Sequence, residues 1–398
     1  MRIGIPKEIR SAEKRVAALP RTVAKYIDMG IEVAVESSAG EGVFISDDEY
    51  EFAGAKIVPD AESLFGESDI ILKVNKPLFN DQMQKHEVNM VKNCSIFISN
   101  LHLTLPENYE IIRQFQNKNI TAISVNEIAE TTGSKKMNIQ TSMNIITGYK
   151  AVIMASDLLP RFIPMVITST GVLGPAKVLV IGTGKVGLQA VTTALQLGGL
   201  VKALDINESA RRNAENHGAD CIQFYCPEEF ASQKEGHAKS IDGEWLEIEQ
   251  RIIKPYLEEA DIVVLSACID GDVAPILVTE QMISTMKPGS VIMDISVDRG
   301  GNCEVTVPDQ IIQRLGVYVS GISNIPGMMA MDGSTIYSEN IFNFVKHLFK
   351  KGIGKIDQND PIVKNCLVTH SGQIWNRLLL NSFALEEDSR DMDVLVNQ

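Results

Sequence analysis

One short segment near the middle of the chain constrains the fold more than any other feature of the sequence. A stretch with strand character, Lys177–Ile181, runs directly into Gly182-Thr183-Gly184-Lys185-Val186-Gly187, and a helical pattern follows. At such a junction the first glycine allows a tight turn, the second lets main-chain N–H groups approach a pyrophosphate, and the third lets the helix pack closely on the strand. The segment therefore predicts a dinucleotide-binding βαβ unit.

The next predicted strand, Leu200–Leu204, ends in Asp205. An acid about 20 residues beyond the glycine loop commonly binds the ribose hydroxyls of adenosine, and its charge repels a 2′-phosphate. NAD(H) is therefore favoured over NADP(H). The alternative is a glycine-rich turn in a domain without a ligand, with Asp205 capping the following helix. Lys185 gives the loop a slight likeness to a P-loop, but no Gly-Lys-Ser/Thr ending follows, which argues against an ATPase.

Strand-like and helix-like segments alternate along the chain, as is typical of parallel sheets whose strands are joined by helices. The chain has 398 residues, more than one core usually holds, and its strands fall into two series. We therefore expect an α/β fold with two Rossmann-like, doubly wound parallel-sheet domains. The first series contains Arg2–Ile5, Glu32–Glu36, Ile70–Val74, Ser95–Ser99 and Thr121–Val125. The second contains Lys177–Ile181, Leu200–Leu204, Cys221–Phe224, Asp261–Ser266, Val291–Ile295 and Val317–Ser320.

Between the two series, Thr141–Leu159 has apolar residues at helical spacing and predicts a long connecting helix that begins at Thr141-Ser142. Thr335–Lys350 has a second helical pattern, and Ile362–Ile374 predicts a β-hairpin that turns at Ser371-Gly372. This last segment is too small to fold alone, so we expect it to pack on the first domain. The expected domains are a discontinuous substrate domain, residues 1–138 with 327–398, and a nucleotide-binding domain, residues 139–326.

Composition argues against several classes of function. A formal net charge of −14 opposes binding to nucleic acid or to an anionic membrane surface. The apolar stretches fall short of the ~20 residues of a membrane helix, and Met1 opens a predicted strand rather than a signal peptide. We therefore expect a cytoplasmic protein. The six cysteines lack the spacing of zinc or redox motifs, so no metal site is predicted.

Four polar side chains suit the chemistry of a small 2-oxo acid or amino acid. Lys73 and His102 come at the ends of predicted strands, where open α/β sheets bind their ligands. Arg15 could clamp a carboxylate, Lys73 could polarise a carbonyl, and His102 could transfer a proton near neutral pH. Asp298 follows a strand of the nucleotide domain and could meet the others only across a cleft. Each of the four also has an ordinary explanation as a solvated, ion-paired or buried structural residue.

A set of short motifs extends over nearly the whole chain: Met1–Glu8, Lys14–Ala17, Ala39–Gly42, Ile71–Pro77, Gly182–Gly187 and Gly289–Asp294. Together they resemble the alanine dehydrogenase and NAD(P) transhydrogenase alpha-subunit family. This resemblance implies two Rossmann-like domains, joined by long helices, with NAD(H) in a central cleft. It also implies that Arg15, Lys73, His102 and Asp298 match the substrate and acid–base residues of alanine dehydrogenase. The residues expected to contact the cofactor are Gly182, Thr183, Gly184, Lys185, Val186, Gly187, Asp205, Ala267 and Asn324.

Further segments resemble the NAD(H)-binding subunit of transhydrogenase more than alanine dehydrogenase. They are Gly300–Glu304, Ser323–Gly327, Thr335–Phe344, Ile362–Thr369 and the insertion Cys226–Leu246, which resembles a mobile loop that closes over NAD(H). Two features differ from that subunit. Glu130, Lys135 and Asn138 stand where the resemblance implies an Arg, Gln and Asp set that holds the nicotinamide against a partner. Asp298 matches the amino-acid dehydrogenases better.

Three functions remain open from the sequence. The first, which we rank highest because the resemblance covers the whole chain, is the alpha subunit of a proton-translocating transhydrogenase. Such a subunit passes hydride between NAD(H) and NADP(H) on a partner, and lies at the inner membrane through its partner subunits. The second is a self-contained NAD-dependent L-amino-acid dehydrogenase of the alanine type, in which His102 and Asp298 manage protons. The third is a catalytically inactive nucleotide-binding regulator. We expect a homodimer or larger assembly, with the connecting helix and Met328–Met331 as candidate contacts.

Overall fold

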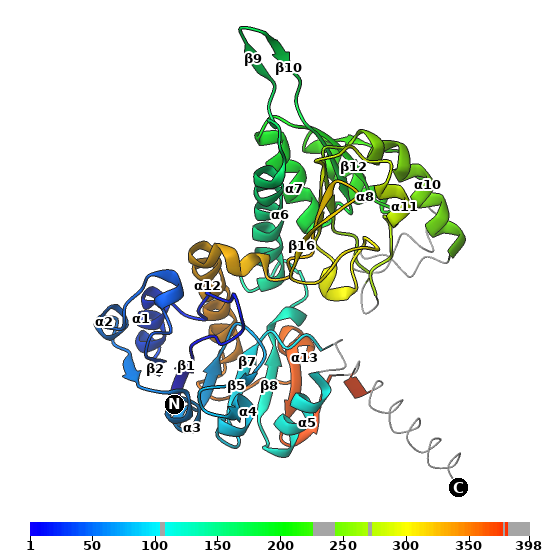
Figure 1. Ribbon diagram of the computed structural model, residues 1–398. Coiled ribbons are helices and arrows are strands. Elements are labelled where there is room, and N and C mark those ends of the chain that lie inside the picture. Colours follow the sequence, from blue (N-terminus) through cyan, green and yellow to red (C-terminus); the bar gives the residue numbers. More distant parts are fainter. Residues whose placement is uncertain (104–107, 226–242, 270–272, 377–378, 381–398) are drawn as a thin grey trace. The chain divides into compact units, whose positions relative to one another are not determined.

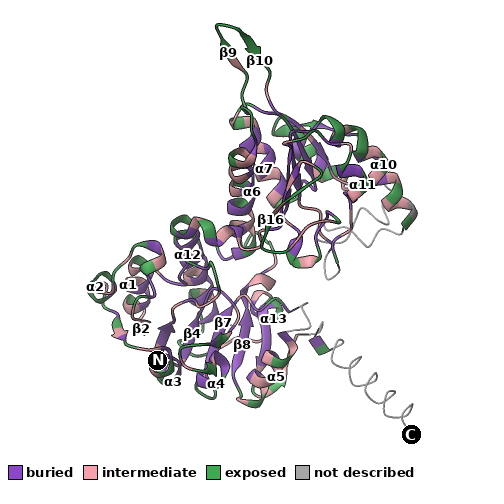
Figure 2. Cartoon of the chain, in the orientation of Figure 1, coloured by how far each residue is buried: buried purple, intermediate pink, exposed green. Residues whose placement is uncertain are grey.

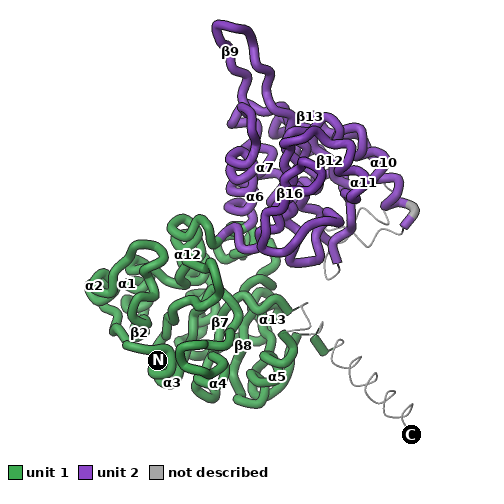
Figure 3. The backbone as a smooth tube through the Cα atoms, viewed as in Figure 1, with its two compact units in different colours: residues 1–143, 327–398 green, residues 144–326 purple. Residues whose placement is uncertain are grey.

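A computed structural model describes residues 1–103, 108–225, 243–269, 273–376 and 379–380 (Figure 1). Most of the expected loop Cys226–Leu246 lies outside the described residues. The chain divides into two compact units, residues 1–143 with 327–398 and residues 144–326 (Figure 3). The C-terminal segment thus belongs to the same unit as the N-terminal one, and the division falls inside the connecting helix.

Unit 1 contains an eight-stranded sheet in the order β19-β18-β8-β7-β4-β1-β2-β3. The strands from β8 to β3 are parallel, and β18 and β19 add an antiparallel edge. Most of the parallel strands are buried on both faces, which explains their short apolar sequences. Their bounds are β1 Arg2–Ile5, β2 Glu32–Glu36, β3 Lys56–Val58, β4 Ile70–Leu72, β7 Ile96–Ser99, β8 Thr121–Ser124, β18 Leu367–His370 and β19 Gln373–Ile374.

Helices pack around this sheet, and acidic or hydroxyl side chains cap α2, α3 and α13. Ser46 and Glu49 form a capping box at the start of α2, and Asp60 caps α3. The bounds are α1 Pro20–Asp28, η1 Glu41–Val43, α2 Asp47–Phe52, α3 Ala61–Glu67, α4 Glu87–Met90, α5 Tyr109–Asn117, η3 Val125–Glu127, η5 Ile325–Met329, α12 Ala330–Leu348 and α13 Pro361–Cys366. A small separate ribbon pairs β5 Phe79–Asn80 with β6 Lys85–His86.

The predicted hairpin Ile362–Ile374 was wrong in its first five residues. These belong to α13, because Asp360 caps that helix by accepting the N–H groups of Ile362 and Val363, and Pro361 occupies its first turn. The hairpin itself is β18–β19. It turns, as predicted, at Ser371 and Gly372, which both have left-handed backbone conformations with φ of 50° and 73°.

Unit 2 contains a seven-stranded sheet in the order β13-β12-β11-β14-β15-β17-β16, parallel except for the edge strand β16. The chain reverses its direction of travel across the sheet between β11 and β14, the position where doubly wound sheets bind ligands. The strands are β11 Lys177–Ile181, β12 Leu200–Leu204, β13 Asp220–Cys221, β14 Ile262–Leu265, β15 Val291–Asp294, β16 Ile311–Arg314 and β17 Val317–Ser320. The helices are α6 Ile139–Leu158, α7 Lys185–Gln196, α8 Glu208–Asn216, α10 Gly243–Glu259, α11 Glu280–Ile283 and η4 Val297–Arg299.

Alternate side chains of β11 enter two separate cores. Val178 and Val180 pack in a cluster with residues of α6 and α7, whereas Leu179 and Ile181 pack with residues of α10 and α11. Helices therefore cover both faces of the sheet, as a doubly wound fold requires. The predicted α/β class with two parallel-sheet, Rossmann-like units is confirmed.

The connecting helix α6 is present but begins at Ile139, two residues before the predicted Thr141. The reason is that Asn138 accepts the N–H of Thr141 through Oδ1 at 2.7 Å, the geometry of a helix N-cap. Asn138 also donates from Nδ2 to the carbonyl of Ile128 at 2.9 Å. A residue expected to mark a difference in function thus has a structural role.

The hairpin β9 Val166–Thr168 with β10 Gly171–Leu173 was not predicted. It extends from unit 2 and is largely exposed (Figure 2). Several of its side chains and those leading into it are apolar, including Met165, Ile167 and Val172, which are 58%, 76% and 62% exposed. An exposed apolar group of this size commonly marks a surface that contacts another protein.

Candidate functional site

The glycine loop of unit 2 depends on the absence of side chains at two positions. Gly182 has a φ of +83°, and a Cβ there would lie 2.7 Å from the nitrogen of Ala267. A Cβ on Gly187 would lie 1.8 Å from the carbonyl oxygen of Gly182, so α7 can approach β11 only with glycine at this point. These contacts are the physical reason for the first and third glycines of the motif.

Gly184 differs from the other two, because a Cβ built on it meets no atom within 4 Å. Its backbone is extended, and no side chain of the described residues caps the start of α7 there. The first N–H groups of a helix have no partners within the helix and attract anions. Gly184, together with the exposed Lys185 and the half-buried Val186, therefore leaves space in front of a helix N-terminus that suits a pyrophosphate.

Asp205 lies at the end of β12 and is held against the glycine loop. Its Oδ2 accepts the N–H of Thr183 at 2.6 Å, and its Oδ1 accepts the N–H of Asn207 at 2.8 Å. Burial raises the pKa of Asp205 above its ordinary value, and these hydrogen bonds oppose the rise. The alternative in which Asp205 caps the next helix is wrong, because Asn207 caps α8 instead.

The remaining residues predicted for unit 2 lie on the loops that follow its strands. Ala267 lies two residues beyond the end of β14, and the half-buried Asn324 lies between β17 and η5. Asp298 is exposed in η4, after β15. Asp294 holds the start of this last loop by accepting the N–H of Ser296 at 3.1 Å and the hydroxyl of Thr306 at 2.8 Å.

In unit 1, Arg15 is buried and paired with Glu13. The guanidinium donates from Nε to Oε1 at 2.8 Å and from Nη2 to Oε2 at 2.6 Å, a bidentate arrangement. Burial by itself would raise the pKa of Glu13, but the hydrogen bonds and the charge of Arg15 outweigh burial and lower it to about 2. Arg15 therefore already has a carboxylate partner within its own chain.

Lys73 is completely buried, and its ammonium group also has carboxylates of its own. Nζ lies 2.9 Å from Oε2 of Glu8 and 3.5 Å from Oε1 of Glu87. Burial raises the pKa of Glu87 to about 7, against the opposing charge of Lys73. Asn75 donates to both Glu8 and Glu13, at 3.1 Å each, and so connects the two ion pairs. We call Glu8, Glu13, Arg15, Lys73, Asn75 and Glu87 the buried ionic network.

His102 is exposed on the loop that follows β7, and it has a left-handed φ of 48°. Its carbonyl oxygen accepts a hydrogen bond from Nδ2 of Asn108 at 2.8 Å. The structure thus brings Arg15 and Lys73 into one network. His102 lies on the loop after β7 of the same unit, and Asp298 lies in the other unit.

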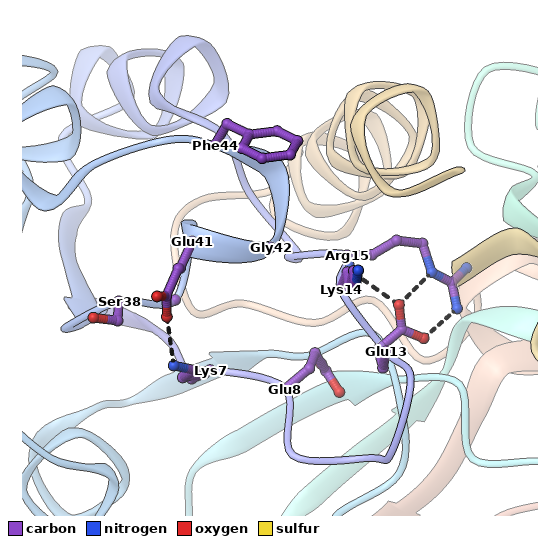
Figure 4. A pocket seen from close by; sticks show the side chains of 10 residues that line it. Lys7, Glu8, Glu13, Lys14, Arg15, Ser38, Glu41, Gly42 and Phe44 are labelled. Carbon is purple, nitrogen blue, oxygen red and sulfur yellow. Dashed lines mark hydrogen bonds and ion pairs between the residues drawn. The ribbon is translucent and has the colours of Figure 1, made fainter. Parts of the chain in front are cut away.

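A cavity of about 300 Å³ lies beside the buried ionic network in unit 1 (Figure 4). On one side of it Lys7 pairs with Glu41 at 3.1 Å, and on the other Arg15 pairs with Glu13. Neither Lys73 nor His102 lines the cavity, so it does not unite the predicted substrate residues. The lining residues are Lys7, Glu8, Glu13, Lys14, Arg15, Ser38, Ala39, Glu41, Gly42 and Phe44.

The three positions expected to differ from the transhydrogenase pattern precede α6. Glu130 and Lys135 are exposed, and Glu130 accepts a long hydrogen bond, 3.4 Å, from the hydroxyl of Thr141. Asn138 is buried as the cap of α6. The described residues contain no group of three or more His, Cys, Asp or Glu that could hold a metal ion. Within the same ranges, every helix is too short or too polar to cross a bilayer.

Sequence reasoning missed the residues that support the site from behind. The predicted cations are neutralised by three carboxylates, Glu8, Glu13 and Glu87. The loops around Gly182 are held by hydrogen bonds of Asn302 and Ser266. Glu13 lies two positions from Arg15, so that pair could have been anticipated. The others are separated from their partners by many residues, and only the fold brings them together.

Comparison with known proteins agrees with the fold. The family models "Alanine dehydrogenase/PNT, N-terminal domain" and "Alanine dehydrogenase/PNT, C-terminal domain" match residues 4–147 and 151–377. An NAD(P) transhydrogenase alpha-subunit protein of Rhodospirillum rubrum is 34% identical over 379 residues, which cover 94% of this chain and 97% of the relative. Alanine dehydrogenase of Staphylococcus epidermidis is 31% identical over 399 residues, 98% of each chain.

Two solved structures are similar over nearly their whole length. The transhydrogenase from Sinorhizobium meliloti has a TM-score of 0.80 and 30% identity, covering 95% of this chain and 100% of that one. An L-alanine dehydrogenase has a TM-score of 0.80 and 25% identity, covering 96% and 99%. The resemblance inferred from the motifs is confirmed.

Proposed function

Since the chain belongs to the alanine dehydrogenase/PNT family, we propose that it is an NAD(H)-binding oxidoreductase of the transhydrogenase alpha-subunit type. It passes hydride between NAD(H) and NADP(H) bound by a partner subunit. Both nucleotides carry the reactive group, so the chain needs no acid or base of its own. Its task is to bind and orient NAD(H) and to exclude water from the point of transfer.

Cofactor recognition is supported by the geometry of unit 2. The space in front of Gly184, at the uncapped start of α7, suits the pyrophosphate. Asp205, held by Thr183, suits the adenosine ribose hydroxyls and disfavours a 2′-phosphate. Ala267 and Asn324 are proposed to line the same strand ends. NAD(H), when bound here, supplies or accepts the hydride.

The choice of the transhydrogenase type rests on the buried ionic network. A dehydrogenase of the alanine type would use Arg15 to hold a substrate carboxylate and Lys73 to polarise the substrate carbonyl. Here Arg15 is bidentate with Glu13, and Lys73 lies between Glu8 and Glu87. A substrate would have to displace buried, charge-assisted hydrogen bonds, which costs several kcal/mol when it leaves a buried charge uncompensated. The network therefore favours a structural role for both cations.

The alternative is the self-contained L-amino-acid dehydrogenase, and one observation favours it. His102 is exposed in a left-handed backbone conformation, and non-glycine residues in that region cluster at functional sites. In this alternative His102 and Asp298 exchange protons with an amino acid or 2-oxo acid. A nucleotide-binding regulator without catalysis is the third candidate, and no observation in the described residues favours it over an enzyme.

We further propose that the chain acts as a homodimer and associates with NADP(H)-binding and membrane subunits. The exposed apolar hairpin β9–β10 supports the dimer, because burial of Ile167 and Val172 against a second copy would remove apolar surface from water. The chain would then be a cytoplasmic protein, held at the inner membrane by those subunits.

The test is turnover without any partner protein. Calorimetry should first show binding of NADH and weak or no binding of NADPH. The chain with NAD⁺ is then incubated with a panel of L-amino acids, and NADH formation is followed. The proposal expects no turnover. Turnover that slows at least ~100-fold in His102→Ala would instead establish the dehydrogenase, since that is the usual effect of losing a general acid or base. Failure to bind NADH would overturn both enzymes.

A further inference from the structure

Asn302 is completely buried on the loop after β15, and every polar group that it carries has a partner. Its side-chain Oδ1 accepts the N–H of Ala267 at 3.1 Å, and Nδ2 donates to the carbonyl oxygen of the same residue at 3.0 Å. Nδ2 also donates to the carbonyl of Pro275 at 2.9 Å. One side chain thus pairs with Ala267 as a neighbouring strand would, and also binds the main chain of Pro275.

The chemistry of this contact requires an asparagine. The side chain must accept one hydrogen bond and donate two from the same terminal group, which among the amino acids only Asn and the longer Gln can do. The reversed amide would place its NH₂ group against the N–H of Ala267. An aspartate would place a carboxylate oxygen against the carbonyls of Ala267 and Pro275. Such a fully satisfied buried amide has a single favourable orientation.

The main chain around Asn302 is equally constrained. Gly300 and Gly301 both have left-handed φ values, 98° and 85°, and a Cβ on Gly301 would lie 2.6 Å from Oδ2 of Asp294. This turn brings the N–H of Asn302 to Asp294, at 3.1 and 2.9 Å from the two oxygens. Asp294 is itself completely buried at the end of β15. Asn302 is therefore anchored to the sheet before it reaches Ala267.

The contact continues from Ala267 to the glycine loop. The nitrogen of Ala267 leaves no room for a side chain at position 182, because a Cβ on Gly182 would lie 2.7 Å from this nitrogen. The neighbouring Ser266 donates from Oγ to the carbonyl oxygen of Gly182 at 2.8 Å. One chain of contacts thus runs from Asp294 to Asn302, from Asn302 to Ala267, and from Ala267 and its neighbour Ser266 to Gly182. It leads from the end of β15 across β14 to the turn in front of α7.

We propose that Asn302 is a positioning residue for the cofactor. Its two hydrogen bonds to the main chain of Ala267 fix the surface against which Gly182 and the pyrophosphate-binding turn pack. This inference rests on the proposed binding of NAD(H) at that turn. It explains why a loop distant in sequence from the glycine motif carries Gly300-Gly301-Asn302. Asn302 binds both polar groups of the Ala267 main chain, and the carbonyl oxygen of Ala267 also accepts the hydroxyl of Ser296 at 3.0 Å. Ala267 therefore contributes position rather than a hydrogen bond to the cofactor.

The test compares NADH binding in the full chain and in Asn302→Ala, by fluorescence titration well below the unfolding temperature. Loss of the hydrogen bonds to Ala267 should raise the Kd for NADH about 10-fold or more, because small displacements of binding groups are costly. The matched control is Asp261→Ala. Asp261 is also buried in unit 2 and binds the N–H of Lys177 at 2.7 Å, but it precedes β14 whereas Ala267 follows it. The control should lower the unfolding temperature and leave the Kd for NADH unchanged.

Asn302→Asp adds a second measurement, the pH dependence of NADH affinity, which would not change if Asn302 had only a structural role. Its ionised carboxylate opposes the carbonyls of Ala267 and Pro275, and protonation restores one donor. Relative to the wild type, its affinity for NADH should therefore recover as the pH falls. Should the Asn302 variants fail to fold, Ser266→Ala removes only the hydroxyl contact to Gly182 and should still raise the Kd severalfold.

Two failures can be told apart. If the wild type does not bind NADH, the proposed function itself fails. If the wild type binds NADH, and folded Asn302→Ala binds it with the same Kd, Asn302 has no positioning role and this inference alone is wrong. Where the Asn302 variants do not fold, an unchanged Kd in Ser266→Ala overturns the inference instead. A Kd that rises equally in Asp261→Ala would also contradict it, because the effect would then follow general stability.

Discussion

Glu13 accepts three hydrogen bonds from Arg15, one from its main-chain N–H at 2.9 Å and two from its guanidinium at 2.8 and 2.6 Å. The two residues lie two positions apart in the sequence and are both buried. Arg15 is thus held as an internal ion pair. This ion pair favours a structural role for Arg15 over a role in binding a substrate carboxylate.

Glu13→Gln should destabilise the protein by about 3–5 kcal/mol at neutral pH, because it leaves the buried Arg15 charge without its carboxylate. The folded-state pKa of Glu13, about 2, lies below its ordinary value of 4.5. Its contribution is therefore complete above pH 4.5 and is lost as the pH falls towards 2. Urea unfolding at pH 7 and pH 3 should show a difference from the wild type that narrows in acid. Equal stability at pH 7 would contradict the pairing.

Glu249 should behave in the opposite sense. It is 3% exposed on α10, and burial together with the charge of Asp205 raises its pKa to about 8. The folded state then loses stability as the pH rises from 4.5 through 8, because the unfolded carboxyl releases its proton over this range while the buried carboxyl keeps it. Glu249→Gln should be more stable than the wild type at pH 9, by up to about 4 kcal/mol, and equal to it at pH 4.5. The exposed Glu247→Gln is the control and should change neither value.

Gly184→Ala and Gly187→Ala should separate cofactor binding from folding. A Cβ on Gly184 enters open space, so this variant should keep the unfolding temperature of the wild type and bind NADH at least about 10-fold more weakly. A Cβ on Gly187 would overlap the carbonyl of Gly182 and should lower the unfolding temperature. Thermal scans with and without NADH measure both effects. Undiminished NADH binding by Gly184→Ala would show that the pyrophosphate lies elsewhere.

Asp205→Asn should change which nucleotide is preferred. It removes the charge that repels a 2′-phosphate and weakens the acceptor for the ribose hydroxyls. The affinity for NADH should fall, and that for NADPH should rise relative to it, when both are titrated at the same ionic strength. An unchanged ratio of the two dissociation constants would exclude Asp205 as the discriminating group.

Much of the fold could be predicted because its central strands are locally encoded. β1 and β11 are short apolar runs bounded by turns and have the predicted bounds, and β14 is one residue shorter at each end than predicted. The edge strand β13 agrees least, because it shares only Cys221 with its predicted range. The elements that were missed are edges or exposed ribbons. β16 (Ile311–Arg314) is largely exposed and antiparallel, and β9–β10 lies outside both main sheets. β9 and β10 have three residues each, which is too short for an apolar pattern to identify them, and β16 lacks the pattern that burial on a core imposes.

The candidate site divides in the same way. The glycine loop and Asp205 are recognisable because their spacing is local in sequence. The partners of Lys73 are not local. Glu8 lies 65 positions away, and the Asn302 contact to Ala267 joins residues 35 positions apart. The sequence identified the cations but could not reveal that buried carboxylates already neutralise them.

The most direct measurement of the central claim is hydride transfer between NADH and an NADP⁺ analogue, with the chain mixed with a purified NADP(H)-binding transhydrogenase subunit. We predict transfer that requires both proteins and changes less than about threefold in His102→Ala, because a step without proton transfer has no use for a general acid or base. No transfer with the partner, together with NADH formation from L-alanine by the chain alone, would contradict the account.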